Sequence, residues 1–150
     1  MYFIDRKNIT ATLTYMNSIM NVIDNTSKFP QDEIEELALE RIAQNIIESI
    51  IDVGNAMIDG FIMRDPGSYD DIIDILLDEK VITADMESSL KEVLSLRRML
   101  VREFMNVDHQ LVSQTIVKNK AALNEFPEKI DLYLTNELGP VSAFIPENTK

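Results

Sequence analysis

Cysteine is absent from this chain of 150 residues, so disulfide bonds, thiolate metal sites and a cysteine nucleophile are excluded. Histidine occurs once, at position 109, and the chain has neither a nucleophile elbow nor a glycine-rich phosphate loop. Its carboxylates include no Glu-x-x-His pair of the kind that marks metal sites in helical bundles. We therefore expect neither a metal ion nor any other cofactor.

The sequence also lacks a long apolar run. No stretch approaches the ~18 apolar residues of a membrane-spanning helix, and residues 1–10 contain Asp5, Arg6 and Lys7 where a secretory signal would be apolar. A length of 150 residues predicts one domain, which we expect over residues 1–140. Residues 141–150 show no periodicity and are expected to form a loosely held tail. These features predict a cytoplasmic protein that does not contact a membrane.

The net charge of -12 is unevenly distributed. Residues 31–90 hold 16 acidic side chains and three basic ones, whereas residues 91–120 hold six basic side chains and three acidic ones. The overall field repels phosphate, so long-range attraction to nucleic acid is not expected. A local basic cleft is compatible with this distribution.

Apolar residues recur at helical spacing along most of the chain, and no segment keeps a period of two. The pattern predicts an all-α domain of about five helices, at residues 6–24, 30–62, 68–77, 84–106 and 109–138. Pro30 suits the first turn of the second helix, and Pro127 is expected to kink the fifth helix rather than end it.

A narrow polar seam follows the second predicted helix. Its members recur every three or four residues within roughly 80° of arc, and they are Arg41, Asn45, Glu48, Asp52, Asn55 and Asp59. Because most of the remaining circumference is apolar, this helix is either the centre of a bundle or part of a dimer interface. The seam is either a solvent-facing side or the wall of a polar cleft. Glu48 and Asp52 lie one turn apart and favour a cation between them.

Arg97 falls in the middle of the apolar face predicted for the fourth helix. A guanidinium keeps its charge and is rarely buried without a partner. We therefore expect Arg97 to bind an anion, either Glu48 or Asp52 in a structural ion pair or the phosphate of a ligand. If the pair is buried, Arg97→Ala is expected to cost about 2 to 4 kcal/mol.

Other charged residues near Arg97 have simpler interpretations. Lys91, Arg98 and Arg102 lie on the flank of the same helix, which is typical of a solvated face. His109 is expected on the surface at the start of the fifth helix. The role of the flanking residues depends on what Arg97 contacts.

Two segments resemble a known family: residues 39–52 (LERIAQNIIESIID) and residues 96–108 (LRRMLVREFMNVD), with one helix before them and a long helix after. They resemble the HepT-like branch of the HEPN superfamily of ribonuclease toxins, over nearly the whole chain. The resemblance implies an antiparallel up-and-down helical bundle that dimerises. It also implies a metal-independent endoribonuclease site across the dimer, built from an arginine, a histidine four to six residues further on, and often a tyrosine two places later.

Within this resemblance, Arg97 matches the motif arginine, while Arg102 occupies the histidine position and Phe104 the tyrosine position. An arginine can hold a phosphate but cannot shuttle a proton near neutrality. Phenylalanine has no hydroxyl to modify. The resemblance also implies a minimal nucleotidyltransferase antitoxin as partner, which in some pairs adenylylates the motif tyrosine, and it assigns Glu48 and Asp52 as acidic partners.

Three functions are compatible with these residues. The first is a dimer that binds RNA or nucleotide phosphate in a cleft lined by Arg97, Arg98 and Arg102, with weak or no cleavage. The second is a catalytically silent dimeric module that binds a protein partner. The third, an active ribonuclease using His109, has the least support, because its Arg-x6-His spacing from Arg102 runs past a predicted helix end at residues 106–108.

Overall fold

The computed structural model describes residues 4–139, which form α-helices and no strand. The helices are α1 (Arg6–Asn25), α2 (Glu33–Gly60), α3 (Tyr69–Asp78), α4 (Ala84–Leu94), α5 (Arg97–Arg102), α6 (His109–Lys118) and α7 (Lys120–Leu138). The all-α prediction is confirmed. The tail predicted at residues 141–150 lies outside the described residues.

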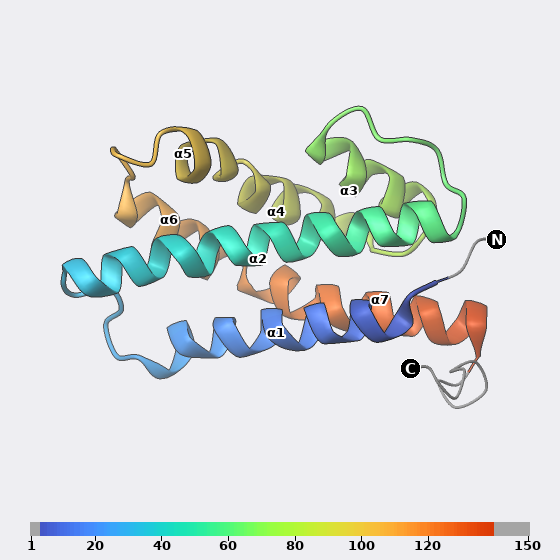
Figure 1. Ribbon diagram of the computed structural model, residues 1–150, viewed down its shortest axis with the longest axis horizontal. Coiled ribbons are helices and arrows are strands. Elements are labelled where there is room, and N and C mark those ends of the chain that lie inside the picture. The colour runs from blue at the N-terminus through green and yellow to red at the C-terminus, as the bar shows by residue number, and fades with distance from the viewer. Residues whose placement is uncertain (1–3, 140–150) are drawn as a thin grey trace.

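The long helix α2 runs through the middle of the molecule (Figure 1). Helices α1 and α7 lie on one side of it and α3, α4 and α5 on the other, and successive long segments run in alternate directions. Direct contacts join α2 to α1, α3, α5 and α6. The broad apolar girth of α2 is therefore covered within the chain, and α2 is the central helix of a bundle.

Helix α2 begins at Glu33, three residues after Pro30, which was expected in its first turn. Asp32 is its N-cap and accepts a hydrogen bond from the backbone N–H of Glu35 at 2.8 Å, while the Glu35 carboxylate accepts one from the N–H of Gln31, also at 2.8 Å. This reciprocal capping satisfies two backbone donors, which explains why the helix starts after Pro30 rather than on it.

Two of the predicted helices are each divided in two. The fourth breaks at residues 95–96, between α4 and α5, and the fifth breaks at Asn119. At Pro127 the helix continues, as predicted, because this residue lies inside α7. Asn119 is buried, and its side-chain amide donates to the Thr115 carbonyl at 2.9 Å and to Glu92 at 3.2 Å. Because the Asn119 side chain is satisfied at the break, the chain can turn there without leaving a buried polar group unpaired.

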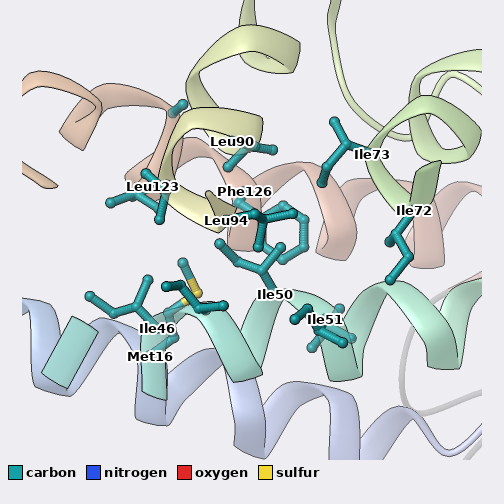
Figure 2. Close-up of a cluster of buried hydrophobic side chains, with 14 of the residues drawn as sticks. Met16, Ile46, Ile50, Ile51, Ile72, Ile73, Leu90, Leu94, Leu123 and Phe126 are labelled. Carbon is teal, nitrogen blue, oxygen red and sulfur yellow. The ribbon is translucent and has the colours of Figure 1, made fainter. Parts of the chain in front are cut away.

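The core is built from apolar side chains of all seven helices, and Figure 2 shows those that α1, α2, α3, α4 and α7 contribute at its centre. Phe126 on α7 is fully buried, as is Ile50 on α2. Helices α2 and α3 approach closely at Gly54, where an added Cβ atom would lie 2.5 Å from Cγ2 of Ile72. Gly54 therefore marks a close helix contact. None of the helices in residues 4–139 is long and apolar enough to span a membrane.

Candidate functional site

The junction between α4 and α5 positions Arg97, the first residue of α5. The N–H of Leu96 bonds to the carbonyl of Val93, three residues back, at 3.1 Å. This tighter turn advances by about 120° per residue instead of 100°. It lets Leu96 join Leu94 in the core and moves Arg97 to the margin of the apolar face. The expectation that Arg97 lies in the middle of that face was wrong for this reason.

Arg97 contacts one carboxylate and one aromatic ring. Its Nε donates a hydrogen bond to Glu48 Oε2 at 2.7 Å, and its guanidinium carbon lies 4.6 Å from the ring centroid of Tyr69. The side chains of Arg97 and Glu48 are 27% and 36% exposed. The hydrogen bond to Glu48 raises the pKa of Arg97 above its ordinary value. The guanidinium is thus a permanent positive charge, with its Nε bonded to Glu48 and one of its faces against the ring of Tyr69.

Glu48 and Asp52 differ in their relation to Arg97. The predicted contact between Arg97 and a carboxylate of the second helix is present, and Glu48 supplies it. Asp52 is exposed and makes no ion pair within the described residues. Both acidic residues line a shallow polar groove between α1 and α2, where Asn45 donates a hydrogen bond to the hydroxyl of Tyr15 at 2.7 Å. This part of the seam is accessible to solvent.

Three arginines and Tyr69 line a second depression, and we call it the arginine depression. It is lined by Ser68, Tyr69, Asp70, Leu94, Ser95, Arg97, Arg98 and Arg102. Arg98 is strongly exposed and lies 3.5 Å from Glu103. Arg102 makes no ion pair within the part of the chain that the structure describes. The structure therefore brings together the three arginines that the sequence singled out.

Phe104, at the position of the family's tyrosine, lies in a loop and not in the fourth helix predicted at residues 84–106. Helix α5 ends at Arg102, so Phe104 falls in the following loop and is 62% exposed, next to Met105 at 83%. The prediction of a continuous helix to residue 106 was wrong, because the segment breaks at residues 95–96 and α5 ends at Arg102. Phe104 and Met105 therefore form an exposed apolar pair in the loop directly after α5.

His109 is not a free surface residue. It is the first residue of α6, is 25% exposed, and its Nε2 lies 2.7 Å from Glu40 Oε2 on α2, with Glu36 4.0 Å from Nδ1. His109 does not line the arginine depression. The pair links the start of α6 to α2 and gives His109 a structural partner that the spacing in sequence did not indicate.

Lys91 also has a structural partner set. Its ammonium group contacts Asp74 on α3 at 2.6 Å and Glu87 on its own helix at 2.9 Å. Lys91 therefore ties α4 to α3 and lies outside the arginine depression. Among residues 4–139, no group of three histidine or carboxylate side chains is arranged to hold a metal ion.

Tyr69 is the site residue that the sequence argument missed. Its side chain is 46% exposed and lies against Arg97, while Ile75 of the same helix is buried. The available signal was its place directly after the N-cap Ser68, because the first residue of a helix can project beyond the stripe that faces the core.

Comparison with known proteins places this fold in a family. A family model described as Ribonuclease HepT-like matches residues 11–130. The chain belongs to the HepT-like ribonuclease family. A Bacillus subtilis (strain 168) protein described as "Putative RNase YutE" is 49% identical to this HepT-like chain over 144 residues, which cover 96% of this chain and 99% of the relative.

Solved structures agree with the family assignment. The structure of YutE from Bacillus subtilis, described as a cytosolic protein of unknown function, superposes with a TM-score of 0.91 at 49% identity and covers 96% of this HepT-like chain and all of that one. A tri-AMPylated HEPN toxin of Shewanella oneidensis in complex with an MNT antitoxin gives a TM-score of 0.69 at 22% identity, covering 83% of this chain and 95% of that one. The second likeness concerns the fold, which is that of HEPN toxins.

Proposed function

We propose that this HepT-like chain forms a dimer that binds RNA, or the phosphates of nucleotides, in the arginine depression with weak or no cleavage. The observation that carries the proposal is the gathering of Arg97, Arg98 and Arg102 in one depression that no histidine lines. Glu48 holds Nε of Arg97, but within residues 4–139 no carboxylate bonds its two terminal nitrogens. Those nitrogens form the planar edge that can bind a phosphate through two hydrogen bonds.

Weak or absent cleavage follows from the chemistry of the lining residues. Attack by an RNA 2′-hydroxyl needs one group that removes a proton and another that returns one. Arg102, at the position of the family's motif histidine, keeps its proton near neutrality. His109, at the start of α6, pairs with Glu40 of α2 and does not line the depression. The depression can therefore hold a phosphate more readily than it can break a phosphodiester.

The dimer is proposed from the family resemblance and from the exposed apolar pair beside α5. Phe104 and Met105 are large, apolar and more than half exposed, and exposed apolar patches rimmed by polar residues mark interaction sites. We expect light scattering at micromolar concentration to report a dimer. The double substitution Phe104→Ser and Met105→Ser should shift it to a monomer, and a monomeric parent protein would contradict the proposal.

We also propose a nucleotidyltransferase antitoxin as partner and a cytoplasmic location. A HEPN toxin of the same fold is described in complex with an MNT antitoxin, and the Bacillus relative is described as cytosolic. Phe104 cannot accept an adenylyl group, since it has no hydroxyl. We therefore expect any such partner to bind this chain without modifying position 104.

A catalytically silent protein-binding module is the second candidate. It is favoured by the Arg97–Glu48 ion pair, which neutralises part of the positive charge, and by the exposure of Phe104 and Met105. RNA binding separates the two candidates, because the module would bind RNA no better than its net charge of -12 allows.

The direct test measures binding of a labelled single-stranded RNA by fluorescence anisotropy at low and physiological salt. Arg97→Ala and Arg102→Ala should each weaken binding. The matched control is Lys7→Ala, which removes one charge from the start of α1, at the other end of the bundle from α5 (Figure 1). Equal loss in Lys7→Ala, or no RNA binding by the parent protein, would refute the RNA proposal.

Cleavage is tested by restoring the family motif. The parent protein is expected to leave tRNA and mRNA intact over hours. The double substitution Arg102→His and Phe104→Tyr recreates the family pattern at exposed positions and should introduce cleavage. Cleavage by the parent that is lost in His109→Ala would instead support a ribonuclease that uses His109.

A further inference from the structure

We propose that Tyr69 is a base-stacking residue, which binds the face of one nucleobase of a single-stranded RNA while the arginines hold the adjoining phosphates. The inference rests on the proposed RNA binding and adds to it a specific contact. Tyr69 lines the arginine depression together with Arg97, Arg98 and Arg102. Base stacking on an aromatic side chain combined with a positively charged surface is the usual way in which proteins hold single-stranded nucleic acid.

Tyr69 is available for a ligand, because the core does not need it. Its side chain is 46% exposed, whereas Ile72, Ile73, Ile75 and Leu76 supply the buried face of α3. The Arg97 guanidinium covers one face of the ring at 4.6 Å. A planar ligand can stack on what remains exposed, so that the base, the ring and the guanidinium form successive layers.

The ring is also held in place before any ligand arrives. Glu48 on α2 fixes Nε of Arg97 at 2.7 Å, and Arg97 in turn lies against Tyr69 at the start of α3. The three residues come from three different helices, and α2 carries much of the core. A preorganised platform loses less side-chain entropy on binding than a mobile aromatic would.

The charge of the protein favours a nucleobase contact over phosphate contacts alone. The chain carries a net charge of -12, and Glu48 and Glu103 lie against two of the three arginines. Phosphate attraction is therefore weak and screened by salt. Stacking does not depend on net charge. The depression also has room for a base, because its volume of about 390 Å³ lies within the size range of small-ligand sites.

The test compares two oligomers of equal length on the intact protein: an oligoadenylate and an abasic ribose-phosphate chain. They carry the same phosphates, but only the first has bases. We expect the parent protein to bind the oligoadenylate more tightly. Tyr69→Leu should weaken oligoadenylate binding roughly 5- to 100-fold, from the usual contribution of one stacked base. Binding of the abasic chain should be unchanged, and Tyr69→Phe should bind both oligomers like the parent.

Each other outcome overturns a defined part of the argument. If Tyr69→Leu binds the oligoadenylate as the parent does while Arg102→Ala does not, the stacking role is wrong and the RNA site stands. If Tyr69→Leu loses affinity for both oligomers equally, Tyr69 acts only by positioning Arg97 and the stacking role is again wrong. If the parent binds neither oligomer, the proposed function and this inference fail together.

Discussion

Helices α2 and α5 show how differently two segments of one small bundle are held. Helix α2 is 28 residues long, contacts four other helices and buries residues along nearly its whole length. Helix α5 has six residues, of which only Leu100 is buried, and it carries all three arginines of the depression, with Arg98 and Arg102 exposed. The comparison teaches that stability and candidate function lie in different segments. Substitutions of the α5 arginines should therefore change binding without unfolding the protein.

The largest expected effect lies in the core against which α2 packs. Phe126→Ala removes a fully buried ring on α7 and should lower the free energy of unfolding by about 3 to 5 kcal/mol, because it leaves a cavity as well as losing burial. Urea denaturation measures the change. Leu132→Ala, at an exposed position of the same helix, is the matched control and should stay within about 0.5 kcal/mol of the parent. Similar costs for both would show that our assignment of the core is wrong.

The next effect tests the close approach of α2 and α3. Gly54→Ala gains about 1 kcal/mol of helix propensity, but its Cβ would lie 2.5 Å from Cγ2 of the buried Ile72. Overpacking of this kind costs about 1 to 3 kcal/mol, so we expect a net loss of about 1 kcal/mol in urea denaturation. In an Ile72→Ala background, where Cγ2 is absent, Gly54→Ala should become neutral or stabilising. A stabilised single variant would contradict the close contact.

The Arg97–Glu48 pair should contribute less than the sequence suggested. Because both side chains are about one-third exposed, an ion pair and a cation–π contact of this kind contribute about 1 kcal/mol together. Arg97→Ala should therefore cost about 1 kcal/mol in urea denaturation, and Arg102→Ala almost nothing. A double-mutant cycle with Glu48→Gln isolates the pair. If Arg97→Ala cost several kcal/mol, α5 would contribute to the stability of the fold as α2 does, and the contrast between the two helices would be wrong.

The smallest effect concerns the loop between α2 and α3. Arg64 binds Asp71 through two hydrogen bonds of 2.7 and 2.8 Å, and the N–H of Gly67 donates a third. These bonds, the one from Arg64 foremost, lower the pKa of Asp71 to about 2 from its ordinary 3.8. Because the pKa of Asp71 is lower in the folded protein than in the unfolded chain, the ionised carboxylate stabilises the fold at pH values above the unfolded pKa. This stabilisation is lost as the pH falls towards about 2.

The measurement for Asp71 is an NMR titration of its carboxyl carbon, which should give a midpoint near 2. In thermal melts, the melting temperature of Asp71→Asn should lie below that of the parent protein at pH 4, and this difference should become smaller as the pH is lowered to 2. Asp70→Asn, at the neighbouring exposed position without such bonds, serves as the control. A midpoint near the ordinary value would show that the Arg64–Asp71 contact does not persist in solution.

Much of the bundle could be predicted from periodicity. Ile9, Leu13, Met16 and Met20 form the buried side of α1 as their spacing indicates. The broad apolar girth of α2 predicted either a central helix or a dimer interface, and the structure shows the central helix. The signals were strong because long segments average over many positions. The two divided helices could not be predicted, because residues 95–96 contain neither proline nor glycine and Asn119 turns the chain through contacts with Thr115 and Glu92.

The candidate site was predictable only in part. The position of Arg97 predicted an anion, and the polar seam offered Glu48 and Asp52 beside a ligand phosphate. The structure selects Glu48 and shows that the pair is partly exposed. Tyr69 beside Arg97 and Glu40 beside His109 depend on residues 28 and 69 positions apart in the chain. Such pairings depend on how helices are oriented against one another, which local spacing does not encode.

The sequence by itself determined that the chain is helical, that its longest helix is packed on several sides and that it resembles the HepT-like family, because these properties depend on patterns over many residues. Only the tertiary structure decided that three arginines and Tyr69 share one depression, and that Phe104 lies outside the core. The physical reason is a single tight turn before α5. Packing of Leu94 and Leu96 stabilises that turn, and the added rotation sets the direction in which the following side chains point.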